Sequence, residues 1–400
     1  MENFLEKTKV GIKERNKRLI LDCIRSNPLI YRSTISTMLN LSKPTVSALV
    51  EELIDEGWVK EEDKDVQHLK VGRKPIRLIF NEQAGFVIGV DIGGSNVEVA
   101  VCDLSGHLIE QCVFNTQDYV NQSLLKKIQD TVFLILKNAE IGPEKVLGMG
   151  VGVPGIVNAE TGMVIDAPSL NWINYPLKAE AEVIFGWDVH IDNDVNVSVL
   201  GEQWLGRAQN KENVVLLSIG TGIGCGILLN GKLYRGSNWG AGEAGFIITD
   251  KNKAETDYAK PFRGYGFLDS QVGGPALVTR MQENVNGVSA HPLQNKHAFT
   301  AKEIFDYAKE GDALATEVIN EFISDLSVAI INIASILNPE IVLIGGGLSK
   351  SGDWFLDRLI EKVNIYTPFQ TDIAIAKLGD QIGVLGAVTL FLEENESVLK

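Results

Sequence analysis

The sequence predicts an α/β protein in which a small helical domain precedes two related α/β lobes, and three observations carry this prediction. Apolar residues recur at helical spacing between Leu19 and Ile54. A strand, a glycine turn and a second strand follow from Phe86, and the same order recurs from Val214. The length of 400 residues and the 45% share of apolar residues suit a globular chain of two or three domains.

The first two helices are predicted by apolar residues that lie three and four positions apart. A tight turn is expected at residues 40–41, before a third helix. The apolar positions are Leu19, Ile20, Cys23 and Ile24 in the first helix, and Ile35, Met38 and Leu39 in the second.

The third helix is expected to begin at Ser42, whose hydroxyl can cap it by accepting a hydrogen bond from an early backbone N–H. Pro44 lies in the first turn, where its missing N–H costs nothing. Small and basic side chains remain on the outer face near the helix start, which suits a DNA groove. The apolar stripe is Val46, Leu49, Val50, Leu53 and Ile54, and the outer face is Lys43, Thr45, Ser47 and Ala48.

A β-hairpin is expected after the third helix, from residues 57–60, an acidic loop and residues 72–79. Its basic tip could follow a DNA backbone or enter a minor groove. The ordered set predicts a winged helix-turn-helix domain over residues 1–80, and the alternative is a small helical dimerisation module. The residues predicted to contact DNA are Lys43, Thr45, Ser47, Arg73 and Lys74.

The charge of the chain is unevenly distributed. The formal net charge is −15, but residues 1–80 carry 15 Lys and Arg against 12 Asp and Glu, which is +3 and leaves −18 for the remainder. This asymmetry lets the N-terminal domain approach phosphates while the acidic remainder points away from them.

The cysteines and the apolar segments argue against two classes of protein. Cys23, Cys102, Cys112 and Cys225 are scattered without a Cys-x-x-Cys pair, so neither a disulfide framework nor a zinc site is indicated, and a reducing cytoplasm fits. The N-terminus has no signal-peptide pattern. The apolar segment around residues 326–337 is too short to span a membrane, and we expect a buried helix there and no membrane partner.

Three glycine turns follow apolar strands, and their backbone N–H groups could approach phosphate oxygens. They lie in residues 87–96, 214–227 and 341–347. One such turn is a weak indication, but three together favour a nucleotide site between two lobes.

Six motifs, in this order, resemble the ROK family (repressors, open reading frames, kinases), which has an actin-like, hexokinase-type ATPase fold. The resemblance covers nearly the whole chain and is to the sugar-responsive repressors with an N-terminal helix-turn-helix. It implies a first lobe at residues 81–194 and 384–400, and a second at residues 195–383. The motifs are Asp91-Ile-Gly-Gly-Ser95, Gly150-Val-Gly-Val-Pro-Gly155, Asp192-Asn-Asp-Val-Asn196, Gly220-Thr-Gly-Ile-Gly224, Gly240-Ala-Gly-Glu-Ala-Gly245 and Gly345-Gly-Gly347.

The resemblance implies a site for ATP and Mg²⁺ between the lobes. Asp91 would help to hold Mg²⁺, and the first two glycine turns would hold the phosphates. The implied phosphate residues are Gly93, Gly94, Ser95, Gly220, Thr221 and Gly222, and the residues that would flank adenosine are Gly345, Gly346 and Gly347.

The resemblance also implies a sugar site. Asn193 and Asp194 match a sugar-binding pair in which the Asp bonds a sugar hydroxyl and, in a kinase, acts as the catalytic general base toward the γ-phosphoryl group. The alternative role for Asp194 is a cap for the helix expected at residues 195–204. The predicted sugar contacts are Ser169, Asn193, Asp194, Glu243 and Asp269.

The chain departs from the family pattern where relatives bind zinc. Phe246 replaces the family's His, and residues 262–269 lack the family's cysteines. We therefore expect no zinc, and expect a hydrophobic plug of Phe246, Phe262 and Phe267 in its place. Ser169 replaces an amide of the family's sugar segment, and together with Phe246 this indicates a ligand different from glucose, or one that is larger or less polar on one face.

The resemblance and the N-terminal pattern together predict a cytoplasmic transcriptional repressor of carbohydrate-utilisation genes. We expect a homodimer or a dimer of dimers that binds an inverted repeat in double-stranded DNA and a sugar or sugar derivative in the cleft. No cofactor is required, although ATP and Mg²⁺ could be accommodated. The alternatives are an ATP-dependent carbohydrate kinase with a regulatory N-terminal module and an ATP-binding scaffold that does not bind DNA.

Overall fold

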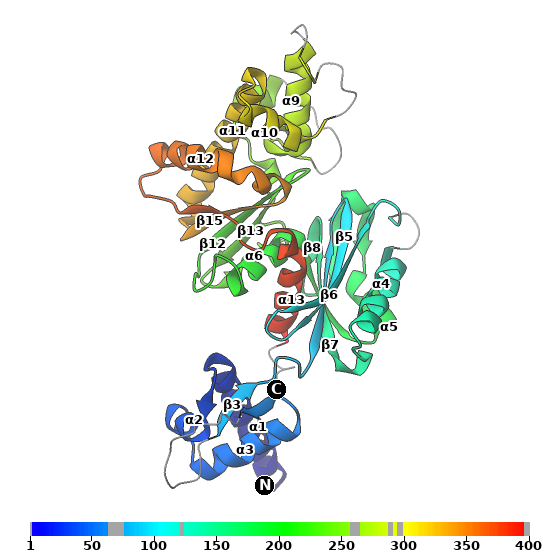
Figure 1. Ribbon diagram of the computed structural model, residues 1–400, viewed down its shortest axis with the longest axis vertical. Coiled ribbons are helices and arrows are strands. Elements are labelled where there is room, and N and C mark those ends of the chain that lie inside the picture. Colours follow the sequence, from blue (N-terminus) through cyan, green and yellow to red (C-terminus); the bar gives the residue numbers. More distant parts are fainter. Residues whose placement is uncertain are drawn as a thin grey trace.

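The computed structural model describes residues 2–62, 76–120, 124–256, 265–286, 291–293 and 299–395, with side chains from residue 11 onward. The described chain forms an N-terminal domain and two α/β lobes, arranged along one long axis (Figure 1). The predicted fold class is therefore confirmed.

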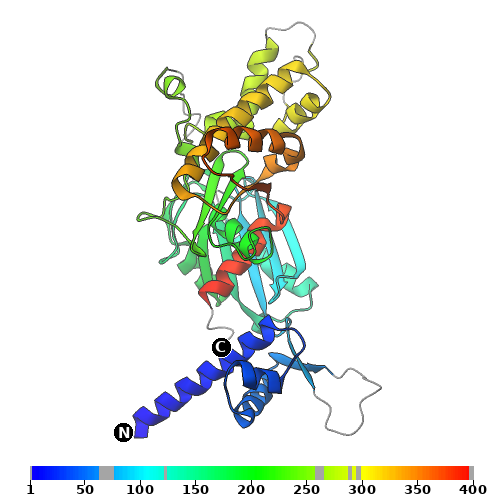
Figure 2. The same cartoon turned by 90° about the vertical axis from the view of Figure 1, so that its left-hand side faces the viewer.

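In its described residues, 2–62 and 76–80, the N-terminal domain has three helices and a three-stranded sheet of order β1-β3-β2. Its core joins Ile20 and Ile24 of the first helix to Ile35, Val46 and Leu53. The first helix is longer than the predicted segment and projects from the domain (Figure 2). The elements are α1 (Glu2–Ser26), β1 (Ile30–Tyr31), α2 (Arg32–Met38), α3 (Lys43–Asp55), β2 (Val59–Glu62) and β3 (Arg77–Phe80).

Lobe I is built on a five-stranded sheet of order β11-β7-β4-β5-β6, in which β4 and β5 are antiparallel and β4, β7 and β11 run parallel. Helices α4 and α5 pack on this sheet, as does the C-terminal helix α13 (Figure 1). The elements are β4 (Phe86–Ile92), β5 (Asn96–Asp103), β6 (Leu108–Asn115), α4 (Leu124–Asn138), β7 (Val146–Val153), α5 (Leu177–Phe185), β11 (Asp188–Asn193) and α13 (Ile382–Glu394).

A small antiparallel sheet of order β10-β9-β8 lies next to lobe I and carries the segment with Ser169. It consists of β8 (Ile156–Asn158), β9 (Met163–Ala167) and β10 (Trp172–Tyr175), with the 3-10 helix η2 (Pro168–Leu170) between the last two strands.

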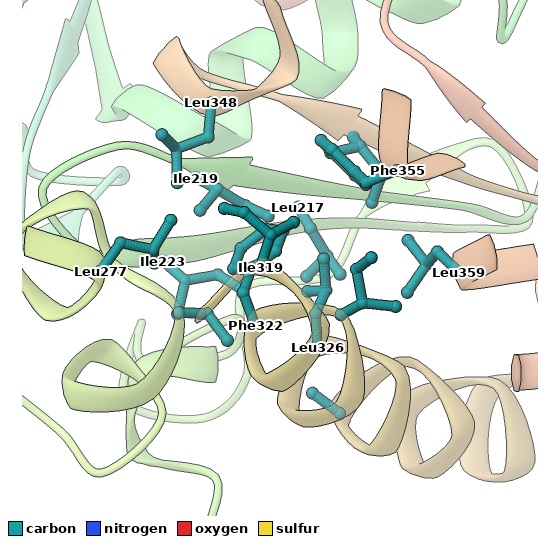
Figure 3. Close-up of a cluster of buried hydrophobic side chains, with 14 of the residues drawn as sticks. Leu217, Ile219, Ile223, Leu277, Ile319, Phe322, Leu326, Leu348, Phe355 and Leu359 are labelled. Atoms are coloured by element: carbon teal, nitrogen blue, oxygen red, sulfur yellow. The ribbon is translucent and has the colours of Figure 1, made fainter. Parts of the chain in front are cut away.

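Lobe II has a second five-stranded sheet, of order β14-β13-β12-β15-β16. Helices α11 and α12 cover one face, where Phe322 and Leu326 pack against Leu217 and Ile219 of the sheet and Phe355 of α12 (Figure 3). The elements are β12 (Val214–Ile219), β13 (Ile223–Leu229), β14 (Lys232–Leu233), η3 (Ala244–Phe246), α7 (Lys251–Thr256), α8 (Asp269–Val272), α9 (Gly274–Asn286), α10 (Ala301–Lys309), α11 (Ala313–Leu337), β15 (Ile341–Gly345), η4 (Gly347–Ser351), α12 (Gly352–Tyr366), β16 (Ile373–Ile375) and η5 (Gly379–Gln381).

Helix α11 is longer than the segment expected from the sequence, because it begins at Ala313 rather than near residue 326. By length and composition its 25 residues could cross a membrane, but half of the apolar window is buried inside lobe II. We therefore assign α11 as the core helix of this lobe.

Helix α6 (Asp194–Trp204) lies between the lobes and packs closely against α13. A Cβ atom added at Gly386 of α13 would lie 1.9 Å from the carbonyl oxygen of Val197, and one added at Gly150 of β7 would lie 1.7 Å from that of Ala387. Glycine is thus required where these backbones meet. The C-terminal end of α6 reaches the N-terminal domain, where Trp204 lines a crevice of about 270 Å³ together with Ile24 and Phe80.

Candidate functional site

The start of α3 is a capped helix end with an open polar face. Ser42 accepts a hydrogen bond from the backbone N–H of Thr45 at 3.3 Å, as the sequence predicts. Lys43 and Ser47 are exposed. Thr45 is half-buried, and its hydroxyl is hydrogen-bonded to that of Ser42 at 2.7 Å. The predicted contacts Arg73 and Lys74 lie outside the described residues.

The acidic half of α3 is paired with cations from the neighbouring helices. Arg32 of α2 contacts Glu51 at 2.8 Å, and Lys13 of α1 contacts Glu52 at 2.8 Å. The Lys17 ammonium donates to the Glu56 carboxylate. These pairs reduce the net negative charge of α3, and Lys43 remains at its exposed end.

A cavity of about 550 Å³ lies between the lobes. Lobe I and its small sheet contribute the turn after β4, η2 and the start of α6, and lobe II contributes the turn after β12 and the loop before η3. This large cavity brings together the predicted residues Gly94, Ser95, Ser169, Asn193, Asp194, Gly220, Thr221, Gly222, Glu243 and Asp269.

Asn193 and Asp194 are placed in the large cavity by the N-terminus of α6. The Asn193 carboxamide oxygen caps the helix, accepting from the N–H groups of Val195 at 2.9 Å and Asn196 at 3.2 Å, and its amide donates to the Gly155 carbonyl at 3.0 Å. The side chain of Asn193, rather than that of Asp194, is therefore the main helix cap. Asp194 accepts a hydrogen bond from the N–H of Val195 at 2.9 Å, and its carboxyl group lines the large cavity.

Glu243 and Asp194 form the acidic side of the large cavity. Burial raises the pKa of Asp194 to about 6, partly offset by hydrogen bonds to the start of α6. Burial, together with repulsion from Asp194 and Asp269, also raises the pKa of Glu243. Hydroxyl groups of a ligand would stabilise these buried carboxyl groups, because each hydrogen bond that a hydroxyl donates favours the charged form of the carboxylate.

Asp269 holds the wall of the large cavity together. It is buried, and its two oxygens accept hydrogen bonds from the N–H groups of Ile223 and Gly266, each at 2.7 Å. This carboxylate therefore links the turn after β12 to the segment before α8, a structural role that the sequence did not indicate.

A smaller pocket of about 220 Å³ meets the large cavity at Asp194, Val195 and Ser218. It is lined by Asp91 and Gly93 from lobe I and by Gly346 and Gly347 from lobe II. The predicted nucleotide residues are therefore divided between two spaces. Gly345 lines neither, because it ends the buried strand β15.

The small pocket has an acidic side with a strongly perturbed carboxyl group. Burial and repulsion from Asp194 and Glu98 raise the pKa of Asp91 to about 8. A bound cation would relieve this repulsion, so Asp91 fits the ligand expected for Mg²⁺. At the mouth, the Lys350 ammonium pairs with Asp380 at 2.7 Å.

The backbone of the small pocket leaves room for a ligand. Gly346 has φ +78°, and a Cβ there would lie 2.5 Å from the carbonyl oxygen of Ile219, so only glycine fits. Gly347 has no atom within 4 Å of the corresponding position. In the described part of the chain, no group of three or more His, Cys, Asp or Glu residues could hold a metal ion by itself. Mg²⁺ at Asp91 would therefore need phosphate oxygens as further ligands.

The predicted hydrophobic plug is wrong for Phe246, whose surface is 48% exposed. Backbone atoms occupy the space beside residue 245. The Leu268 N–H donates to the Gly245 carbonyl at 2.8 Å, and a Cβ atom at Gly266 would clash with the same carbonyl. Phe267 is buried, and Phe262 lies outside the described residues.

Several residues at the site were missed by the sequence analysis. Gln117 lines the large cavity and donates to the Gly94 carbonyl at 2.8 Å. Trp239 also lines it. Arg235 crosses from lobe II to the buried Asp192 of lobe I, with 2.6 Å between Nε and Oδ2. Of these three residues, only Trp239 could have been found from the sequence, because it lies in a glycine-rich loop.

Comparison with known proteins gives matches along the described domains. The sequence model of the ROK family matches residues 87–394, and that of winged helix-turn-helix DNA-binding domains matches residues 13–60. The chain is 33% identical to the xylose repressor of Caldicellulosiruptor bescii over 96% of either chain.

Two solved structures share the fold. A ROK family transcriptional regulator, described as a homologue of the MLC protein of E. coli, has a TM-score of 0.79 at 23% identity and matches 97% of this chain and 98% of its own. A ROK family glucokinase from Streptomyces griseus, in complex with glucose and AMPPNP, has a TM-score of 0.63 at 26% identity. The match covers 76% of this chain and 99% of the glucokinase, so the part of this chain without a counterpart has the size of the N-terminal domain.

Proposed function

This chain belongs to the ROK family, and from that premise we propose that it is a sugar-responsive DNA-binding repressor of carbohydrate-utilisation genes whose effector binds in the large cavity. One observation carries the proposal: the chain joins a helix-turn-helix with an exposed polar face to a cavity lined by the carboxyl groups of Asp194 and Glu243. A kinase would need only the cavity and not the helix-turn-helix.

The effector is a sugar of monosaccharide or disaccharide size. A polyhydroxylated ligand suits Asp194, Glu243 and Asn193, which together offer acceptors and an amide to hydroxyl groups. The name of the Caldicellulosiruptor relative makes D-xylose the first candidate. Sugar binding changes the position of the DNA-binding domains by an equilibrium coupling that needs no ATP hydrolysis.

The DNA contacts are proposed to be Lys43, Thr45 and Ser47, with Arg73 and Lys74 at the tip of the wing. The repressor acts as a homodimer, and exposed apolar side chains at the ends of α11 and α12, Ile336, Ile365 and Tyr366, support an interface between copies. Two such DNA-binding domains require an inverted repeat with half-sites spaced by whole helical turns.

The proposal is tested by operator binding with and without sugar. An operator is first selected from a random DNA library with the purified protein, and its affinity is then measured by fluorescence anisotropy. The sugar panel contains D-xylose, D-glucose, disaccharides and sugar phosphates, each with and without Mg²⁺ and ATP. We expect one sugar to release DNA equally well without ATP, whereas release that requires ATP hydrolysis would contradict the proposal.

The recognition helix has its own test in Lys43→Ala. If Lys43 contacts a phosphate, the variant should bind all sequences more weakly and lower the salt slope by about one unit. Lys309→Ala in lobe II is a matched control that removes one lysine far from the DNA face. Wild-type affinity and salt slope in Lys43→Ala would refute its assignment.

A carbohydrate kinase is the second candidate, because Asp91, Asp194 and the glycine turns remain in place. In that role Asp194 would accept the proton of the sugar hydroxyl, and the backbone of the turns would position the phosphates. ATP and Mg²⁺, which the small pocket would hold at Asp91, supply the phosphoryl group. Turnover of many per second that disappears in Asp194→Asn would make this the main function.

A further inference from the structure

The loop before η3 contains a strained aromatic residue at the large cavity. Trp239 has φ +63°, a left-handed conformation that a bulky side chain rarely adopts. Among the described residues, six of the nine non-glycine residues with positive φ are asparagine, which tolerates it, and Trp239 is the aromatic one. Such strain persists where the surrounding structure enforces it, and it concentrates at functional sites.

The loop is fixed at both ends, which explains how the strain is maintained. On one side, Arg235 is held by Asp192, whose other oxygen accepts from the backbone N–H of Asn193 at 2.7 Å and the amide of Asn196 at 2.9 Å. On the other side, the Gly242 carbonyl accepts from the N–H of Cys225 at 2.9 Å. The loop carrying Trp239 is therefore tied to the same segment that positions Asn193.

Among the described residues, the rest of the large cavity offers no free aromatic surface. Tyr265, the other aromatic residue that lines it in the described chain, is buried, and its hydroxyl donates to the Thr221 carbonyl. Trp239 is half-buried and lies at the cavity with no hydrogen bond or ring contact among the described interactions. The polar groups Asn193, Asp194 and Glu243 can hold the hydroxyl groups of a sugar but cannot contact its apolar C–H faces.

We propose that Trp239 is a specificity-determining residue, whose indole ring covers one C–H face of a pyranose while Asn193, Asp194 and Glu243 hold its hydroxyl groups. An aromatic face is electron-rich and attracts polarised C–H groups, and covering an apolar sugar face also removes it from water. The site therefore selects sugars whose hydroxyls are equatorial, because an axial hydroxyl on the covered face would lose its hydrogen bonds to water against the ring. This inference rests on the proposed function, since it takes the large cavity as the sugar site.

The test separates the aromatic ring from the backbone strain. Trp239→Gly removes the ring and relieves the left-handed strain, Trp239→Ala removes the ring and keeps the strain, and Trp239→Phe keeps a smaller ring. Affinity for D-xylose and its C2 epimer D-lyxose is measured by calorimetry, without DNA, on the full chain. Thermal unfolding is measured on the same samples.

Both Trp239→Gly and Trp239→Ala should bind D-xylose about tenfold more weakly than wild type, a change of about 1.4 kcal/mol, and should lose the preference over D-lyxose. Trp239→Phe should lie between. Trp239→Gly should have a Tm about 2 °C above that of Trp239→Ala, since only glycine is unstrained there. Glu140→Gly, at φ +56° on the surface, is the control in which strain is relieved and sugar affinity stays unchanged.

Sugar affinity and preference that are unchanged in Trp239→Gly would overturn the inference and leave the proposed function standing. If wild type binds sugar but does not release the operator, the repressor mechanism is refuted. The sugar affinities of the Trp239 variants then still decide the role of Trp239. Absence of sugar binding by wild type would overturn both.

Discussion

The large cavity and the small pocket share Asp194 but are built for different ligands. The large cavity has a volume of about 550 Å³ and combines free acceptors with an aromatic residue, whereas the small pocket has about 220 Å³ and a carboxyl group whose pKa is raised to about 8. A neutral sugar can enter the large cavity and gain hydrogen bonds. The small pocket would gain most from a cation, so we expect any affinity for a nucleotide to depend on Mg²⁺.

From this difference we expect that the backbone of a nucleotide site can be kept even where sensing does not require a nucleotide. Packing alone requires glycine at Gly346, which would therefore remain in a protein that never bound ATP, whereas no neighbouring atom requires glycine at Gly347. Among the described carboxylates of the large cavity, Asp269 is the one that links two distant backbone segments. Substitutions that affect only one of the two spaces therefore test whether they bind different ligands.

Asp194→Asn should have the largest effect, because Asp194 lines both spaces. Sugar affinity should fall by about 10- to 100-fold, the cost of losing a charged hydrogen-bond acceptor, while operator affinity without sugar should stay unchanged. Calorimetry and anisotropy measure the two quantities. A variant that responds normally to sugar would remove Asp194 from the effector site.

Glu243→Gln should weaken sugar binding by about tenfold without changing the small pocket, which Glu243 does not line. Glu255→Gln on the exposed face of α7 is the matched control and should bind sugar as wild type does. Equal affinities in the two variants would show that the Glu243 carboxylate does not contact the ligand.

Asp91→Asn should change stability and its pH dependence but not sugar binding. The folded-state pKa of Asp91 is raised from 3.8 to about 8, so the folded protein binds more protons than the unfolded chain between these values. The resulting stability is fully present below pH 4 and is lost as the pH rises through about 8. The variant should therefore unfold about 2 °C or more above wild type at pH 8, and by less at pH 5.

Thermal unfolding of wild type and Asp91→Asn between pH 5 and pH 8 measures this difference in Tm. Addition of Mg²⁺ and ATP provides the control, because a cation at Asp91 would stabilise wild type and not the variant. If Asp91→Asn were less stable than wild type at pH 8, the raised pKa would be wrong.

Lys350→Ala should have the smallest effect, because the pair with Asp380 is exposed on both sides. Such pairs contribute between about 0 and 1 kcal/mol to the free energy of unfolding. Chemical denaturation measures the difference. A loss well above this range would mean that the pair holds η4 and η5 together at the mouth of the small pocket.

The sequence predicted the parts of the site that depend on local chemistry. The cap at Ser42 follows from a side chain and a backbone N–H three residues apart, and the structure contains this bond. The large cavity likewise contains the predicted Ser169, Asn193, Asp194 and Glu243, because each lies in a motif at the end of a strand or helix. Their contacts with a ligand remain predictions.

The parts that the sequence did not predict depend on contacts between distant segments. The pair between Arg235 and Asp192 joins two lobes, and Asp269 bonds Ile223 across 46 positions of the chain. The error at Phe246 has the same origin, since the plug was inferred from residue type alone and the space was filled by the backbone of residues 245 and 266. Periodicity does not report such contacts.

The glycine contacts between α6, α13 and the sheet of lobe I have a mechanical consequence. Backbone lies on backbone at Gly386 and Gly150, with no side chain between that could change its rotamer and absorb a displacement. We therefore expect α6 to move as one rigid element, with Asp194 at one end and Trp204, beside the N-terminal domain, at the other. We expect a small tilt at the cavity to reach the DNA-binding domain through this seam, and we expect a side chain larger than glycine at Gly386 or Gly150 to push apart the backbones that meet there.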